Sequence, residues 1–204
     1  MDGVIVDTEP LNAQHQHEFL ARLGVEPKDL NTSIQGLNSQ AIWSLYREEY
    51  SLEQDIDELI TQARQSYLSF LETLDHIPEI PGASQFIEYL VSLRCRLAIA
   101  SSANPKRIEL ILDKLRLRKY FQVIISGDST PRSKPAPDMF LLAAEKLGAR
   151  PSDCIVIEDA TNGVQAAKAA GMICIGYAGS DHNTDDLSEA DIIINDFTEI
   201  TNQL

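Results

Sequence analysis

The chain has 204 residues, of which 44% are hydrophobic and 24% are charged, and its formal net charge at pH 7 is −14. These proportions are ordinary for a globular protein and exclude a disordered or fibrous chain. The negative charge argues against a protein that binds nucleic acid or an anionic membrane surface, because both polyanions would be repelled. A small group of basic residues, Arg116, Arg118 and Lys119, is interpreted as a solvated helix end.

The three cysteines, Cys95, Cys154 and Cys174, lack the spacing of a disulfide framework or a zinc site. Each lies beside or within an apolar run, so we expect small buried residues in a reducing compartment. No apolar run approaches the roughly 18 residues of a membrane span, and the N-terminus lacks a signal-peptide pattern. We therefore expect a cytoplasmic protein, either a monomer or a weak homodimer.

The first ten residues, MDGVIVDTEP, are typical of the end of a buried strand that runs into a loop carrying carboxylates. From residue 10 to residue 74 the pattern becomes helical, because apolar residues recur at three- and four-residue steps. The stretch IPEIPG at residues 77–82 then interrupts it with two prolines and a glycine, which indicates a linker between two units.

After this linker, short apolar runs alternate with helical segments. The predicted strands are residues 96–101, 123–126, 154–159, 173–177 and 191–195, and the predicted helices are residues 83–93, 105–115, 137–147 and 163–170. Strands this apolar, alternating with helices, predict an α/β fold with a Rossmann-like parallel sheet that is covered on both faces.

Chemistry-capable side chains follow four of the predicted strands, where sheets of this kind bind ligands. They are Asp2 and Asp7, the pair Ser101 and Ser102, Lys134, and the pair Glu158 and Asp159. Carboxylates suit a hard cation such as Mg²⁺, while a hydroxyl and an ammonium group suit phosphoryl oxygens. The combination predicts a site for a phosphate monoester bound with a divalent metal.

Each group taken alone has an ordinary structural explanation. Residues 101–105 could merely cap the next helix, residues 134–138 could form a rigid loop with an N-cap, and Glu158 and Asp159 could be a solvated strand end. Capping and anion binding are compatible, since a helix N-terminus is itself an anion site. Their joint appearance at strand ends favours the functional interpretation.

Five stretches carry a family resemblance: DGVIVDTEP, PGASQFIEYL, LAIASSAN, SGDSTPRSKPAPDMF and IVIEDATNGVQAAKAAGM. The chain resembles the haloacid dehalogenase superfamily of phosphotransferases, in the branch with a small helical cap that includes β-phosphoglucomutase and many sugar-phosphate phosphatases. The resemblance implies a Rossmann-like core domain, residues 1–9 and 78–204, with an α-helical cap domain inserted at residues 10–77. The active site would lie between them.

The resemblance also implies a role for each matching residue. Asp2 would be the general acid and base, with its backbone carbonyl on Mg²⁺. Ser101, with Ser102 and Asn104 beside it, would bind the phosphoryl group, and Lys134 would pair with that group and with the nucleophile. Asp159 and Glu158 would complete the metal site, and Asp128 would be a supporting acid.

The family's nucleophile is an aspartate two residues before the acid. In the family signature a glycine directly follows the acid, and because Gly3 directly follows Asp2, Asp2 matches the acid and not the nucleophile. The sequence starts at Met1, one residue after the position of the nucleophile. We therefore expect the natural chain to carry several more apolar residues, then an Asp, then Met1. The rival interpretation is a pseudoenzyme that binds a phosphorylated ligand without hydrolysing it.

The expected activity is Mg²⁺-dependent hydrolysis of a small, sugar-phosphate-like monoester, through an aspartyl phosphate if the upstream Asp exists. A phosphomutase is a weaker alternative, because Asn38, Ser39 and Gln40 stand where the mutase has a basic residue, and Asn104 stands where it has a lysine. In the predicted cap, His15, His17 and Trp43 are expected to pack or to face solvent rather than to bind sugar.

Overall fold

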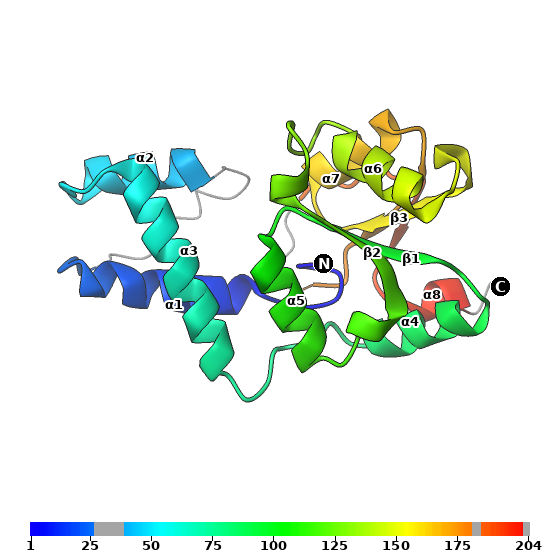
Figure 1. Cartoon of the computed structure of the whole chain (residues 1–204), viewed down its shortest axis with the longest axis horizontal. Coiled ribbons are helices and arrows are strands. Elements are labelled where there is room, and N and C mark those ends of the chain that lie inside the picture. Colours follow the sequence, from blue (N-terminus) through cyan, green and yellow to red (C-terminus); the bar gives the residue numbers. More distant parts are fainter. Residues whose placement is uncertain (27–38, 181–184, 202–204) are drawn as a thin grey trace. The chain divides into compact units, whose positions relative to one another are not determined.

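The computed structural model describes residues 1–26, 39–180 and 185–201 of the chain. It divides into two compact units, shown in Figure 1. We call Met1–Thr8 together with His76–Leu204 the core unit, and Glu9–Asp75 the helical unit. The division therefore falls at the start of the first helix and just before the proline-containing linker.

The core unit holds the strands, and every described strand pair is parallel (Figure 1). One sheet pairs β1 (Leu97–Ser101) with β2 (Phe121–Ser126). The other has the order β3 (Ile155–Glu158), β4 (Ile173–Tyr177) and β5 (Ile192–Ile194). The α/β class and the parallel pairing predicted from the apolar runs are confirmed.

Helices and short 3₁₀ turns connect these strands. The helices are α4 (Ala83–Ser92), α5 (Pro105–Lys114), α6 (Asp138–Leu147), α7 (Thr161–Ala169) and α8 (Thr198–Thr201), and the turns are η2 (Arg118–Tyr120), η3 (Gly127–Ser129) and η4 (Pro151–Asp153). Helix α6 packs on β1 and β2, and α7 packs on β3 and β4. Gly148 caps the C-terminus of α6, and its left-handed backbone (φ 63°) suits a residue without a Cβ.

Residues 1–6 form a hydrogen-bonded turn instead of the predicted strand end. The carbonyl oxygen of Met1 accepts from the backbone N–H of Ile5 at 2.8 Å, and the N–H of Gly3 donates to the carbonyl of Val6 at 2.8 Å. Val4, Ile5 and Val6 are buried. The backbone groups of this turn are satisfied partly within it, by a bridge between Asp2 and Val6, and partly by the linker, through a bridge between Val6 and Glu79 and a hydrogen bond from the N–H of Ile80 to the carbonyl of Ile5 at 2.8 Å.

A cavity of about 460 Å³ lies in the core unit between the two sheets. Its walls include Leu97 to Ala100 of β1 and Ile155 to Glu158 of β3, with Val4 and Ile5 also lining it. The edges of β1 and β3 thus face this cavity, and among the described strands neither edge pairs with a further strand there. The residues that line this space are mainly apolar.

The helical unit is built from α1 (Glu9–Arg22), α2 (Ser39–Glu49) and α3 (Ile56–Thr73). Asp55 caps α3, since its side chain accepts from the backbone N–H groups of Asp57 and Glu58. The buried cluster of this unit consists of Phe19, Leu20, Trp43, Tyr46, Leu52, Leu59 and Ile60. Trp43 makes edge contacts with Phe19 and Tyr46, so it packs inside the unit as expected.

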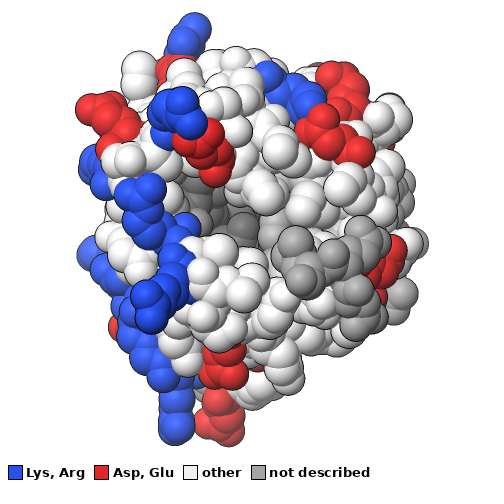
Figure 2. Space-filling model, turned by 90° about the vertical axis from the view of Figure 1, so that its right-hand side faces the viewer, with Lys and Arg blue, Asp and Glu red and all other residues white. Residues whose placement is uncertain are grey.

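Basic side chains gather along one side of the view in Figure 2. Of the group singled out in the sequence, Arg118 pairs with Glu109 at 2.7 Å, and the ammonium of Lys119 lies 4.7 Å from the ring centre of Tyr120. Arg116 is exposed just after α5. These are the contacts of a solvated helix end.

The cysteines differ in exposure, which corrects one expectation. Cys174 is buried and Cys154 is partly buried, but Cys95 is exposed because it lies in the turn between α4 and β1. No helix in the described part of the chain is both long and apolar enough to cross a membrane.

Candidate active site

The polar residues predicted from the strand ends gather in the core unit, where β1 and β3 end. Ser101 is the last residue of β1 and Glu158 the last residue of β3, and both are buried. Lys134 enters from the loop between η3 and α6. Because the carboxyl ends of parallel strands lie at the same edge, residues more than 50 positions apart meet here.

Lys134 connects the two strand ends. Its ammonium group forms an ion pair with Oε1 of Glu158 and donates to the carbonyl oxygen of Ala100 at 3.4 Å. It also lies 4.9 Å from the ring centre of Phe140. The side chains of Lys134 and Glu158 are only 13% and 8% exposed, so their charges compensate each other with little help from water.

Asp159 lies directly against Gly3. A Cβ atom built on Gly3 would overlap Oδ2 of Asp159, and the backbone of Gly3 is left-handed with φ 68°. Burial, and after it the negative charges of Glu158 and Asp2, raise the pKa of Asp159 to about 7, although the amino terminus and a backbone hydrogen bond act to lower it. This carboxylate is therefore short of positive charge.

Asp2 has the opposite electrostatic environment. Its Oδ1 accepts a hydrogen bond from Oγ1 of Thr8 at 2.7 Å and an ion-paired hydrogen bond from Nη2 of Arg107. Burial alone would raise the pKa of Asp2, but the positive charge of Arg107 and of the amino terminus, with these hydrogen bonds, lowers it below its ordinary value. Asp2 and Asp159 are thus carboxylates with pKa values shifted apart.

The start of α5 lies next to this site. Asn104 is its N-cap, and its side chain accepts from the backbone N–H of Arg107 at 2.9 Å. The hydroxyl of Ser101 accepts from the N–H of Ala103 at 3.2 Å, while Ser102 is exposed. The capping explanation therefore holds for Asn104, and a role of Ser101, Ser102 and Asn104 in phosphate binding stays a prediction.

Asp128, predicted as a supporting acid, is exposed on the η3 turn. The turn is closed by Ser126 and Ser129, whose hydroxyl groups lie 2.9 Å apart. Gly127 comes close to Ser102, since a Cβ built on Gly127 would lie 2.6 Å from the carbonyl oxygen of Ser102. The η3 turn can therefore lie this close to the loop after β1 because residue 127 has no side chain.

The carboxylates of the site are candidate ligands for a hard cation. In the described part of the chain, no group of three or more His, Cys, Asp and Glu side chains is placed to hold a metal by itself. Mg²⁺ commonly uses one or two carboxylates together with substrate phosphates and water. Asp159, whose raised pKa reflects burial and a lack of nearby positive charge, and the backbone carbonyl of Asp2 fit such a site. The carboxylate of Glu158 instead forms an ion pair with Lys134.

Two residues of this site, Thr8 and Arg107, are absent from the sequence-based prediction. Thr8 follows the apolar stretch GVIV, and Arg107 lies in the first turn of α5. A signal for Thr8 was available, since it immediately follows the acidic residue Asp7. Arg107 gives no such signal, because its partner Asp2 is 105 positions away.

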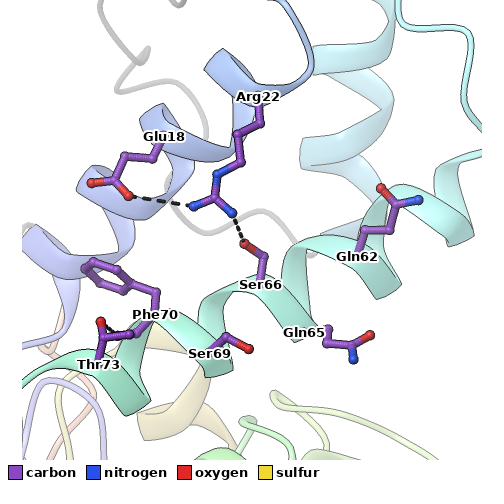
Figure 3. A pocket seen from close by; sticks show the side chains of 8 residues that line it. All are labelled: Glu18, Arg22, Gln62, Gln65, Ser66, Ser69, Phe70 and Thr73. Atoms are coloured by element: carbon purple, nitrogen blue, oxygen red, sulfur yellow. Dashed lines mark hydrogen bonds and ion pairs between the residues drawn. The ribbon is translucent and has the colours of Figure 1, made fainter.

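The helical unit has a separate groove of about 520 Å³ between α1 and α3, shown in Figure 3. Arg22 lies between Glu18 and Ser66 in this view, donating to the hydroxyl of Ser66 at 3.1 Å. Nε2 of the buried His15 lies 2.9 Å from the same hydroxyl. His15 thus packs between helices, and His17 is exposed, as predicted.

Three residues were compared in the sequence with the basic residue of the mutase. Asn38 lies outside the described residues, Ser39 begins α2, and Gln40 is exposed.

Residues 1–177 match the family model described as haloacid dehalogenase-like hydrolase. The chain belongs to this family. Fructose-1-phosphate phosphatase YqaB of Escherichia coli is 34% identical over 177 residues, covering 84% of this chain and 90% of the relative. The phosphorylated carbohydrates phosphatase of Thermotoga maritima is 31% identical, covering 84% and 79%.

Solved structures of the family agree with this fold. A haloacid dehalogenase hydrolase of family IA, variant 3, from Entamoeba histolytica matches with a TM-score of 0.84 at 27% identity, covering 100% of this chain and 93% of that one. A candidate β-phosphoglucomutase from Thermotoga maritima matches with a TM-score of 0.83 at 27% identity, covering 100% and 96%. The predicted family and its phosphatase branch are confirmed.

Proposed function

We propose that this haloacid dehalogenase-like phosphatase hydrolyses a small phosphorylated carbohydrate and uses Mg²⁺. The observation that carries the proposal is the meeting of Lys134, Glu158, Asp159 and Asp2 where β1 and β3 end. The named relatives act on fructose 1-phosphate and on phosphorylated carbohydrates, which supports this substrate class. The protein would act in the cytoplasm, as a monomer or a weak homodimer.

Lys134 would bind the phosphoryl group. Its ammonium is nearly buried, and its fixed position against Glu158 gives a cation that needs little reorganisation when an anionic substrate arrives. The hydroxyl of Ser101 and the N-terminal N–H groups of α5 would hold further phosphoryl oxygens. Ser102 and Asn104 flank that position.

Asp2 would transfer protons. Its carboxyl group would protonate the leaving oxygen and later take a proton from water, a step for which side-chain carboxylates are suited when they are held within hydrogen-bonding reach. The carboxylate of Asp159 and the backbone carbonyl of Asp2 would hold Mg²⁺, with Glu158 nearby. When bound, this ion would offset the negative charge of the phosphoryl group and of these carboxylates.

The covalent step would use an aspartate two positions before Asp2, which would attack phosphorus and expel the sugar oxygen. The resulting aspartyl phosphate would then be cleaved by water, regenerating the carboxylate and releasing phosphate. That position precedes Met1, so the proposal can be tested by adding an aspartate there.

The decisive experiment compares two extended proteins. One carries about five apolar residues and then Asp directly before Met1, a length suited to a short strand. The matched control carries Asn in place of that Asp. Phosphate release from a panel of sugar phosphates is measured with Mg²⁺ and with EDTA.

We expect Mg²⁺-dependent phosphate release by the Asp form alone. Equal rates in the Asp and Asn forms, or a rate that EDTA leaves unchanged, would contradict the proposed mechanism. If both forms bind the sugar phosphates and neither releases phosphate, the protein is a ligand-binding pseudoenzyme. If ³¹P NMR shows the phosphate moving between hydroxyl groups of one sugar, the activity is that of a phosphomutase.

A further inference from the structure

Asp2 is held from one side by two side chains. Oγ1 of Thr8 donates to Oδ1 of Asp2 at 2.7 Å, and Nη2 of Arg107 makes an ion-paired hydrogen bond to the same oxygen. Nη2 also lies 3.4 Å from Oγ1 of Thr8, so the three groups form a closed triangle. The side chain of Arg107 is 19% exposed and that of Asp2 is 33% exposed.

The backbone of Arg107 is fixed at the place where α5 begins. Its N–H donates to Oδ1 of the N-cap Asn104, and Pro105 begins the helix. The next residue, Ile108, is completely buried and anchors this turn in the core unit. Arg107 therefore reaches Asp2 from a rigid helix rather than from a loop.

A carboxylate that exchanges protons with a substrate must present one oxygen in a constant direction. Both contacts fall on Oδ1 of Asp2, so they restrain this oxygen and leave Oδ2 as the oxygen that would exchange the proton. Small losses of alignment are expensive, since a displacement of about 1 Å can cost a reaction about 10²-fold. With Thr8 as its only partner, the carboxylate of Asp2 would have a single neutral hydrogen bond and could rotate about it.

We propose that Arg107 is a positioning residue, which orients Asp2 for proton transfer together with Thr8. This inference rests on the proposed function, because it concerns the same acid. It goes beyond that function because it assigns to Arg107 the orientation of Asp2 and not the binding of substrate.

The kinetic test uses the extended protein with the upstream Asp. Arg107→Met keeps much of the side-chain length but removes both contacts, and Arg107→Lys restores one cation, which suffices because a single nitrogen makes both contacts. Lys106→Met is the matched control, an exposed cation one position earlier on the same helix. We expect Arg107→Met to lower kcat 10- to 100-fold, on the scale known for misaligned groups, and to leave KM within about threefold of the parent value. Arg107→Lys should recover part of the lost kcat.

Three kinetic results would overturn the inference. They are an unchanged kcat in Arg107→Met, a rise in KM with kcat preserved, which would make Arg107 a substrate-binding residue, and a Lys106→Met variant that is equally impaired. A smaller folded fraction would also lower the apparent kcat and leave KM unchanged, so kcat is referred to the folded fraction of each variant, measured by thermal melts under the assay conditions.

A second measurement needs no activity and separates this inference from the proposed function. In the 204-residue chain, the unfolding equilibrium constants of Arg107→Met, Asp2→Asn and the double variant form a cycle. We expect the effect of Arg107→Met to be at least about fivefold smaller in the Asp2→Asn background, the scale of a partly buried ion pair. If the extended protein releases no phosphate, the proposed function fails, and this cycle alone decides: strictly additive effects would refute the Arg107–Asp2 pair.

Discussion

The ammonium group of Lys134 and the carboxylate of Glu158 form an ion pair in which the side chains are 13% and 8% exposed. The pair joins the loop before α6 to the last residue of β3. Because neither charge is well hydrated, each depends on the other, and a substrate anion that approaches Lys134 has to share it with Glu158.

Lys134→Met is expected to lower the free energy of unfolding by about 3 kcal/mol, because it leaves the carboxylate of Glu158 buried without a cation. Urea unfolding of the 204-residue chain measures the change. Lys134→Met combined with Glu158→Gln should recover much of the loss, since no buried charge then remains. A double variant that is less stable than either single variant would show that the two side chains stabilise the protein independently.

Gly3→Ala is expected to displace the carboxylate of Asp159, whose Oδ2 occupies the space that the new Cβ would need. The affinity for Mg²⁺ in the presence of orthophosphate should fall roughly 10- to 100-fold, as for other changes that disturb the support of a metal ligand. Gly171→Ala is the matched control: Gly171 has a similar φ of 72°, but a Cβ there meets nothing within 4 Å. Equal losses in both variants would assign the effect to backbone strain.

Asp159 should make the metal-free protein less stable as pH rises from about 4 to about 7. Its pKa in the folded protein is about 7, above the ordinary value of 3.8, so in this interval the folded state binds more protons than the unfolded state. Asp159→Asn removes this dependence and should be more stable than the parent at pH 8 by at least roughly 1 kcal/mol. Thermal melts across pH without Mg²⁺ test this. Parallel stability curves for parent and variant would disprove it.

His15 should give the helical unit the opposite pH dependence. Burial and the charge of Arg22 lower its pKa to about 4, so between pH 6.5 and 4 the unfolded state takes up the proton and stability is lost as pH falls. The loss is expected to be roughly 2 kcal/mol over this interval. Fluorescence of Trp43, the single tryptophan and a member of this unit's buried cluster, follows the unfolding.

His15→Gln should flatten this acid dependence, since glutamine can still bond to Ser66 but does not titrate. His17→Gln provides the control on the same helix, because His17 is exposed. A variant at position 15 that keeps the full acid dependence would assign it to other groups.

The three thiols should react at well separated rates. Cys95 is exposed, whereas burial raises the pKa of Cys154 and raises the pKa of Cys174 to about 12. Since the thiolate is the reactive form, a thiol reagent at pH 8 should label one equivalent quickly, and Cys95→Ser should abolish that fast phase. Fast labelling that persists in Cys95→Ser would contradict the burial of the other two.

Most elements could be predicted because they are encoded locally. The strand at residues 173–177 has the predicted bounds, and α4, α5 and α6 begin or end within one residue of the prediction, since Gly82, Pro105 and Gly148 mark their ends. Strand β2 begins two residues early, at Phe121, because pairing with Leu97 of β1 extends it. The strand end predicted for residues 1–6 is wrong, since an apolar run of this length can be buried in a turn as well as in a strand.

Local sequence patterns were enough to predict the parallel α/β class, the helical segment before the linker, and the polar residues at or after strand ends, which are Ser101, Lys134, Glu158 and Asp159. How those groups pair depends on the folded chain. The ion pair of Glu158 with Lys134 and that of Asp2 with Arg107 were not predicted. Periodicity and capping depend on neighbours a few positions apart, whereas an ion pair depends on which segments folding brings together, and that distance in sequence is 24 positions for one pair and 105 for the other.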